Sequence, residues 1–278
     1  MTKWIQTLRK KLKHEVLRVK LSKRQQFVVI TAILTTGLFL TQLVSPDSRY
    51  PMVIFLSLLA YILTAWGLSD DLKGIEWGSL LILPTLFTAG VSLFYFLLPV
   101  RWLTRLPVAA AYAVGLYALL LTENIYNVAV NRTIALLRAA HSVGFLLTLV
   151  TFFLLLQSLI AFGYPVLIEL PLAVIVTGAL VFQALWSVEL EEVVSEKVLH
   201  LSVAITTIVS MCVWVLYFWP LNKTLLVLLV TTVFYSLAGM AQQFIGLRLY
   251  RKTIIEYVSV LCIVLVIILF SANWRAGV

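Results

Sequence analysis

Nine apolar runs, each close to the length that crosses a membrane, follow one another along most of this sequence. They cover residues 26–44, 52–68, 79–99, 107–122, 143–163, 171–187, 198–219, 225–247 and 257–271. A helix needs about 20 apolar residues, with a range of roughly 17–25, to cross a bilayer. The second, fourth and ninth runs are the shortest, and spanning β-strands would instead be short and alternating. The sequence therefore predicts an all-α fold, a polytopic helical transmembrane bundle with eight to nine spans.

Composition excludes a water-soluble fold of the usual kind. Hydrophobic residues make up 62% of the chain and charged residues 12%, whereas soluble domains carry about 25% charged residues. A soluble protein could not hide so much apolar surface. The apolar runs are nearly continuous, so we expect one transmembrane domain, residues 26–278, after a basic segment, residues 1–25.

The basic segment concentrates positive charge at the start of the chain. Nine of the 21 lysines and arginines lie in the first 25 residues, against the single acid Glu15. At helical periodicity Trp4, Leu8 and Leu12 fall on one apolar face, which predicts an amphipathic helix lying in the membrane interface and contacting anionic lipid. The alternative is a solvated basic tail that only sets topology. Nucleic-acid binding is not expected, because no segment remains to read bases.

The distribution of positive charge also predicts orientation. If the N-terminus is cytoplasmic and the spans alternate, sixteen of the 21 lysines and arginines fall on the cytoplasmic side and five on the other. Short cytoplasmic loops are enriched in these residues. Without the first 25 residues the division is only seven to five, so the basic segment decides it. We expect a multi-pass protein of a bacterial inner membrane with a cytoplasmic N-terminus.

The segment Glu123–Ser142, between the fourth and fifth apolar runs, is too polar to span and long enough for about five helical turns. Its polar candidates lie on or beside one face of a helical wheel: Glu123, Asn124, Asn127, Asn131, Arg132, Arg138 and His141. We predict a separate cytoplasmic helix whose polar face meets water. The alternative is a polar groove facing the bundle, which would bind a headgroup or another anion through Arg132 and Arg138.

Two further sets of residues are candidates for function. Polar residues inside spans are Gln157, Gln183, Gln242 and Gln243. Such side chains usually bond neighbouring helices, but they could also line a transporter cavity near mid-membrane. On the outer side lie Asp47, Arg49, Arg101 and Arg105. Arginine binds phosphate through two parallel hydrogen bonds, so this set fits a lipid-linked phosphate, although the short loops leave little room for a catalytic platform.

No motif fixes a reaction. The sequence contains no phosphate-binding loop, zinc-protease motif, hydrolase elbow or C-x-x-C pair. Cys212 and Cys262 lie in apolar runs and indicate small buried side chains. We therefore expect no catalytic residue, cofactor or metal ligand that can be named.

One stretch, residues 122–153, resembles uncharacterised bacterial polytopic integral membrane proteins of unknown function. The residues that carry the resemblance read TENIYN from Thr122, RTIALLRAAH from Arg132, and VGF from Val143. The resemblance implies a membrane location and no activity. We interpret the chain as a non-enzymatic membrane component. A small-molecule or lipid transporter and an enzyme acting on a lipid-linked phosphate at the outer face are the alternatives, and protein partners and oligomeric state stay open.

Overall fold

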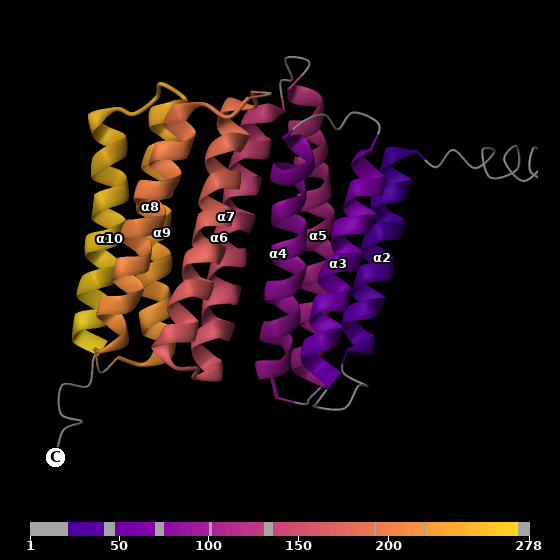
Figure 1. The fold of residues 1–278 in the computed structure, drawn as a ribbon, viewed down its shortest axis with the longest axis horizontal. Helices are drawn as coiled ribbons and strands as arrows, with labels where there is room; N and C mark the ends of the chain where they lie inside the picture. The colour runs from indigo at the N-terminus through magenta and orange to yellow at the C-terminus, as the bar shows by residue number, and fades with distance from the viewer. Residues whose placement is uncertain are drawn as a thin grey trace, which may run out of the picture.

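The computed structural model describes residues 22–41, 48–69, 75–99, 102–130, 136–191, 193–219 and 221–271. Within these ranges it contains nine α-helices and no strand (Figure 1). The helices are α2 (Lys23–Leu40), α3 (Arg49–Leu68), α4 (Glu76–Leu97), α5 (Trp102–Ala129), α6 (Leu137–Phe162), α7 (Val166–Glu189), α8 (Glu196–Tyr217), α9 (Lys223–Ile245) and α10 (Arg251–Ser271). The all-α prediction is confirmed. The predicted basic helix, residues 1–25, lies almost wholly outside the described residues.

Successive helices run in opposite directions and lie nearly side by side (Figure 1). Short connections between helices favour this antiparallel order. The helices α2, α4, α6, α8 and α10 begin at the upper end of the bundle as drawn in Figure 1, and α3, α5, α7 and α9 begin at the lower end. Residues far apart in sequence therefore meet at each end.

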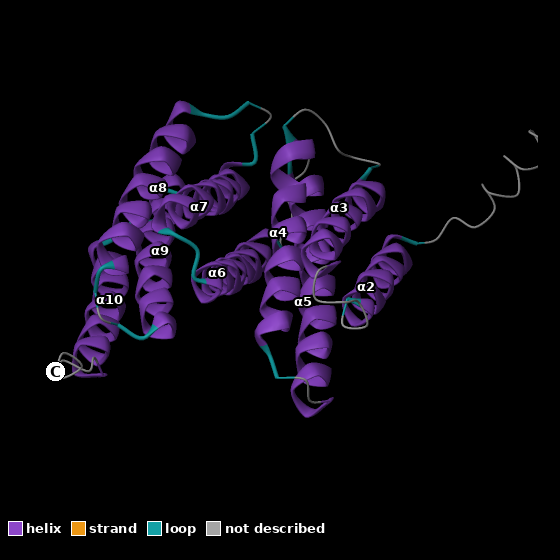
Figure 2. Cartoon of the chain, turned by 60° about the horizontal axis from the view of Figure 1, so that its bottom comes forward, coloured by secondary structure: helices purple, strands orange, loops and turns teal. Residues whose placement is uncertain are grey.

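The bundle has two groups of helices with α6 between them. The first group is α2 to α5 and the second is α7 to α10 (Figures 1 and 2). Helix α6 packs against α4 and α5 on one side and against α7 and α9 on the other. Helix α10 lies at one edge, packs mainly against α9, and buries only Ile268. The core is thus deepest around α4, α6 and α9.

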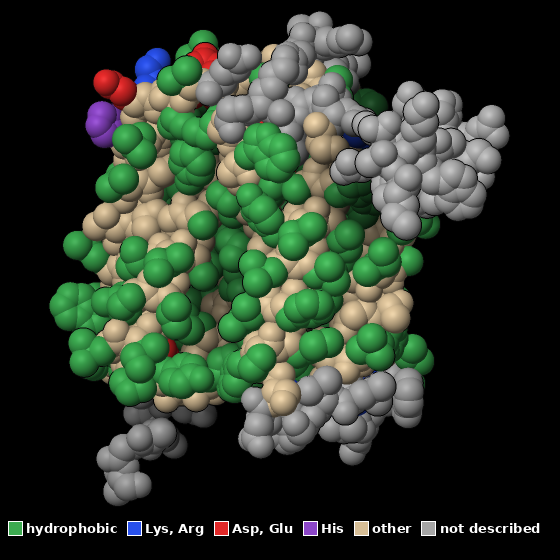
Figure 3. All heavy atoms as spheres, turned by 45° about the vertical axis from the view of Figure 1, so that its right-hand side comes forward, with side chains coloured by type: hydrophobic (Ala, Val, Ile, Leu, Met, Phe, Trp, Pro, Cys, Tyr) green, Lys and Arg blue, Asp and Glu red, His purple; other side chains and the backbone are tan. Residues whose placement is uncertain are grey.

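The exterior of the bundle is apolar over its middle, as contact with lipid requires. Eight of the described helices, α3 to α10, are long and apolar enough to cross a membrane. Figure 3 shows one face on which hydrophobic side chains cover the middle, while most of the charged side chains in view lie at the upper rim. The prediction of a multi-span membrane protein is confirmed. Helix α2, 18 residues long with Lys23 and Arg24 in its first turn, is not among the eight, yet it packs beside α3 and α5.

Local sequence explains where two of the helices begin and end. Ser22 precedes α2, and its hydroxyl accepts from the backbone N–H of Gln25 while the Gln25 side chain accepts from the backbone N–H of Ser22. This reciprocal cap satisfies two N–H groups that a helix start leaves free. Gly163 ends α6 with φ 67°, a left-handed conformation that costs glycine little. The chain can therefore turn back sharply into α7.

The prediction of a separate helix at Glu123–Ser142 is wrong. Glu123–Ala129 is the last part of α5, and Leu137–Ser142 is the first part of α6. The fourth span is correspondingly longer than the predicted 107–122: its 28 residues extend about 42 Å, against about 30 Å of hydrocarbon. The physical reason is that the polar residues near the end of α5 find partners on other helices and do not need water. Asn131 and Arg132 lie outside the described residues.

Candidate functional site

Polar side chains are buried together near the upper end of the bundle. We name Glu123, Tyr126, Asn127, His141 and Gln183 the polar cluster. Glu123 and Asn127 are four residues apart on α5 and therefore share a face, and their side chains are 0% and 1% exposed. That face is turned toward other helices. The expectation that it meets water is therefore wrong for these two residues.

Glu123 is joined to the second group of helices by one side-chain hydrogen bond. The Nε2 atom of Gln183, on α7, donates to Glu123 Oε1 over 3.2 Å. Gln183 is 2% exposed. The other oxygens of this pair, Glu123 Oε2 and Gln183 Oε1, have no hydrogen-bond partner among the described residues. Each of these two side chains therefore has one acceptor that is still available.

The rest of the polar cluster bonds the backbone of neighbouring helices. Asn127 Nδ2 donates to the carbonyl oxygen of Leu68, at the end of α3, over 3.1 Å. The Tyr126 hydroxyl donates to the carbonyl of Ala140 on α6 over 2.9 Å. His141 Nε2 lies 2.8 Å from the carbonyl oxygen of Ser187, near the end of α7. Helix α5 is thereby tied to α3, α6 and α7 at one level of the bundle.

The tyrosine and histidine of the cluster also pack on each other, and a glycine makes room for them. The ring centroids of Tyr126 and His141 are 5.5 Å apart. A Cβ atom added at Gly144 would overlap the Tyr126 hydroxyl and lie 3.2 Å from Thr122 Cγ2. Tyr126 and Gly144 were not singled out from the sequence. The i, i+3 spacing of Tyr126 from Glu123 was the available signal.

The remaining predicted polar residues are distributed differently. Asn124 is half-buried, whereas Arg138 is exposed and does not join the polar cluster. Gln242, on α9, donates to the carbonyl of Ala184 on α7 over 2.8 Å, and Gln243 lies against Tyr257 of α10. Gln157 lies toward the other end of α6. The four glutamines therefore do not meet in one mid-membrane cavity, and Gln183 and Gln242 connect helices.

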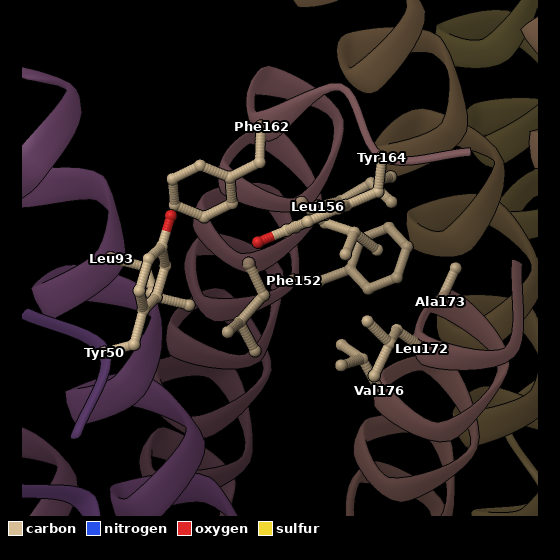
Figure 4. Close-up of a pocket in the computed structure, with 11 residues that line it drawn as sticks. Tyr50, Leu93, Phe152, Leu156, Phe162, Tyr164, Leu172, Ala173 and Val176 are labelled. Carbon is tan, nitrogen blue, oxygen red and sulfur yellow. The ribbon is translucent and has the colours of Figure 1, made fainter. Parts of the chain in front are cut away.

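A cleft opens at the opposite, lower end of the bundle. It has a volume of about 250 Å³ and is formed by α3, α4, α6, α7 and the α6–α7 connection (Figure 4). We name it the lower cleft. Leu93, Phe152, Leu156 and other apolar side chains line it, and Tyr50 and Tyr164 bring hydroxyl groups to it. The Tyr50 ring meets that of Phe162 edge to face, with centroids 5.7 Å apart. An apolar cleft with two hydroxyls suits a hydrocarbon chain that carries a polar end.

Positive side chains surround the same end. The Arg49 guanidinium lies over the Phe96 ring, 5.6 Å from its centroid, and the Arg105 guanidinium lies over Tyr95 at 6.0 Å. Both arginines therefore meet the end of α4. Lys223, at the start of α9, lies beside Gly163 in the connection that carries Tyr164.

Two members of the predicted outer set, Asp47 and Arg101, lie outside the described residues. The structure brings the other two, Arg49 and Arg105, to one helix end. The cleft beside them was missed in the sequence, because Tyr50 and Tyr164 belong to different segments and their approach depends on how α3, α4, α6 and the α6–α7 connection come together.

Within the described residues no three His, Cys, Asp or Glu side chains gather closely enough to hold a metal ion. Three glutamates are buried among the described residues: Glu76 in the first turn of α4 and Glu123 near the end of α5 lie at the upper end, and Glu169 in the first turn of α7 lies at the lower end.

Comparison with known proteins gives a family and no activity. No curated protein and no solved structure matches the sequence significantly. One family model does match, over residues 50–271, and this range contains α4 to α10 and nearly all of α3 together with both the polar cluster and the lower cleft. The chain therefore belongs to DUF5656, a family described as proteins of unknown function.

Proposed function

We propose that this protein is a non-enzymatic membrane component that binds an anionic lipid, with part of one lipid chain in the lower cleft. The observation that carries the proposal is the apolar cleft of about 250 Å³ with Arg49 directly before the cleft residue Tyr50. Sites for whole drug-sized ligands are roughly 300–1,000 Å³. The lower cleft is smaller, which fits a segment of one chain better than an entire soluble molecule.

Selectivity would come from the headgroup. Hydrocarbon gains little by moving from lipid into an apolar cleft, because both surroundings are apolar. Arg49, Arg105 and Lys223 supply positive charge at the same end. Arginine binds phosphate oxygens through two parallel hydrogen bonds. A phospholipid or another lipid-linked phosphate is therefore the ligand class that the chemistry favours.

The proposed orientation follows the positive charge of the sequence. With a cytoplasmic N-terminus in a bacterial inner membrane, the upper end faces the cytoplasm and the lower cleft opens toward the outer leaflet. The basic segment, residues 1–25, would then contact anionic lipid of the inner leaflet. Two contacts with lipid on opposite leaflets would fix the protein in the membrane without any reaction.

Native mass spectrometry of the purified full chain tests the proposal. We expect one phosphate-bearing lipid to survive in mild detergent. Ala173→Phe places a ring in the cleft, where Ala173 is 2% exposed, and should remove most of the bound lipid. Ala204→Phe adds the same ring to an exposed position of α8 and should retain it. Arg49→Gln should weaken retention of anionic lipid about fivefold, as expected for roughly 1 kcal/mol per positive charge.

Size-exclusion chromatography checks that each variant is folded. If Ala173→Phe does not fold, Leu172→Trp, at a half-exposed position of the same cleft, takes its place. A wild-type protein without lipid in several mild detergents would contradict the proposal, and so would equal lipid retention in the folded Ala173 and Ala204 variants.

A lipid transporter is the second candidate. It is favoured by the position of the lower cleft between the two groups of helices, where a rocking motion would open a path. Transfer of a fluorescent lipid between leaflets of proteoliposomes, faster than in empty liposomes and slowed by Ala173→Phe, would select this candidate over a static binding component.

A further inference from the structure

We propose that the polar cluster is a binding site for one small monovalent cation, either a proton or Na⁺. This inference concerns Glu123 and its neighbours and does not depend on lipid binding at the lower cleft. It assigns a ligand class to the polar side chains that the lipid proposal leaves without a role.

Glu123 carries the carboxyl group of the polar cluster. Its side chain is 0% exposed. Among the described residues, no lysine, arginine or histidine forms an ion pair with it, and the group that bonds it is the neutral amide of Gln183. An uncompensated carboxylate buried in a protein costs several kcal/mol or more. A proton or a bound cation removes that cost.

The polar cluster has a surplus of buried hydrogen-bond acceptors. Glu123 Oε2, Gln183 Oε1 and Asn127 Oδ1 have no donor among the described residues, whereas buried polar atoms are normally paired. The amide orientation of Asn127 is fixed, because Nδ2 donates to the Leu68 carbonyl, which can only accept. Its oxygen is therefore an available acceptor.

Two of the three acceptors, Glu123 Oε2 and Gln183 Oε1, belong to side chains that are joined by the 3.2 Å hydrogen bond. Asn127 stands one turn from Glu123 on the same face of α5.

The oxygens define the kind of ligand. Carboxylate and amide oxygens are ligands for hard cations, and a single carboxylate balances one positive charge. A buried water could donate to the same oxygens, but it would leave Glu123 charged. A monovalent ion or a proton therefore matches the polar cluster better than a divalent ion or water alone.

The groups that face Glu123 do not supply the missing charge. Tyr126 lies one turn away on α5, and His141 on α6 packs against the Tyr126 ring. His141 Nε2 faces the Ser187 carbonyl, so this nitrogen carries the hydrogen. Arg248, between α9 and α10, lies near His141. On α7 the neutral Gln183 bonds Glu123, and the neutral Ser187 lies beside Tyr126.

The test uses the purified full chain in detergent. Thermal unfolding is followed in NaCl, KCl and choline chloride of equal ionic strength and across a pH series. Bound Na⁺ would give a saturable rise of a few degrees in Tm over choline chloride, and Glu123→Gln would abolish it. A bound proton would instead give no Na⁺ dependence and an infrared band of a protonated carboxyl that Glu123→Gln removes.

A control variant locates the effect. Glu169→Gln removes a buried carboxyl at the lower end and should leave the Na⁺ response or the Glu123 band unchanged. If Glu123→Gln does not fold, the Na⁺ titration and infrared spectrum of the wild type still decide. The proposal is overturned if the wild type shows neither signal, or if a folded Glu123→Gln variant keeps the signal.

Discussion

Local backbone bonds close helices at both ends of the bundle, and the upper end adds side-chain bonds between helices. At the upper end, side chains of one helix bond the terminal carbonyls of another: Asn127 reaches the last residue of α3, and His141 reaches Ser187 near the end of α7. At the lower end, α6 is closed locally by Gly163. The last four carbonyls of a helix lack a partner within that helix. Either a side chain from another helix or a local backbone N–H can supply one.

The difference has a consequence for rigidity and for ligand binding. The cross-links at the upper end join α5 to α3, α6 and α7 and fill the space between the helices with polar groups. At the lower end Tyr50 and Tyr164 interact through their side chains, and space between the helices remains as the lower cleft. We therefore expect stability to depend mostly on the upper end and lipid binding mostly on the lower end.

The largest expected effect comes from filling the space beside Tyr126. Gly144→Val places side-chain atoms against the Tyr126 hydroxyl and Thr122, and overpacking of this kind costs about 1–3 kcal/mol. We expect about 3 kcal/mol, because the hydrogen bond to Ala140 is also lost. Gly78→Val is the matched control, since nothing lies within 4 Å of a Cβ atom there. Equal unfolding free energies for the two variants would contradict a rigid upper end.

Removing the amide that joins α5 to α7 should be next in size. Gln183→Leu leaves both Glu123 oxygens without a donor among the described residues, which costs about 1–3 kcal/mol for a buried polar group. Gln157→Leu makes the same change toward the lower end, where the Gln157 oxygen already lacks a partner, and should cost less than about 0.5 kcal/mol. Thermal unfolding of both variants in one detergent measures the difference. A larger loss of stability in Gln157→Leu than in Gln183→Leu would contradict the expectation that stability depends mostly on the upper end.

The sequence was sufficient for the bundle and insufficient for the polar cluster, for a physical reason. Long apolar runs identify helices that cross hydrocarbon, whatever their neighbours are. A polar residue near the end of such a run can face water or a partner on another helix, and these cases look alike in sequence. Glu123 finds its partner 60 residues away and Asn127 finds its partner 59 residues away. Only the packing of α3, α5 and α7 reveals those contacts.

The lower cleft was not predictable for a related reason. Arg49 and Arg105 were recognised as candidates because charged residues beside a span are conspicuous. The cleft depends on where space is left between α3, α4, α6 and α7, and on small residues such as Ala173 that leave it. An absence of side-chain volume produces no motif, and apolar runs of similar composition can pack with or without a cleft.

The smallest expected effect compares one hydroxyl at each end. Tyr126→Phe removes the hydrogen bond to the Ala140 carbonyl at a position that is 1% exposed, and a bond of this kind contributes about 0.5–1.5 kcal/mol. Tyr164→Phe removes a hydroxyl at the lower cleft from a side chain that is 39% exposed, so its stability change should stay within about 0.5 kcal/mol. Lipid retention should fall more in Tyr164→Phe than in Tyr126→Phe, because of these two tyrosines only Tyr164 lines the cleft. Measuring both quantities on both variants separates a role in stability from a role in binding, and a single variant that lowers both would show that the two ends act as one unit.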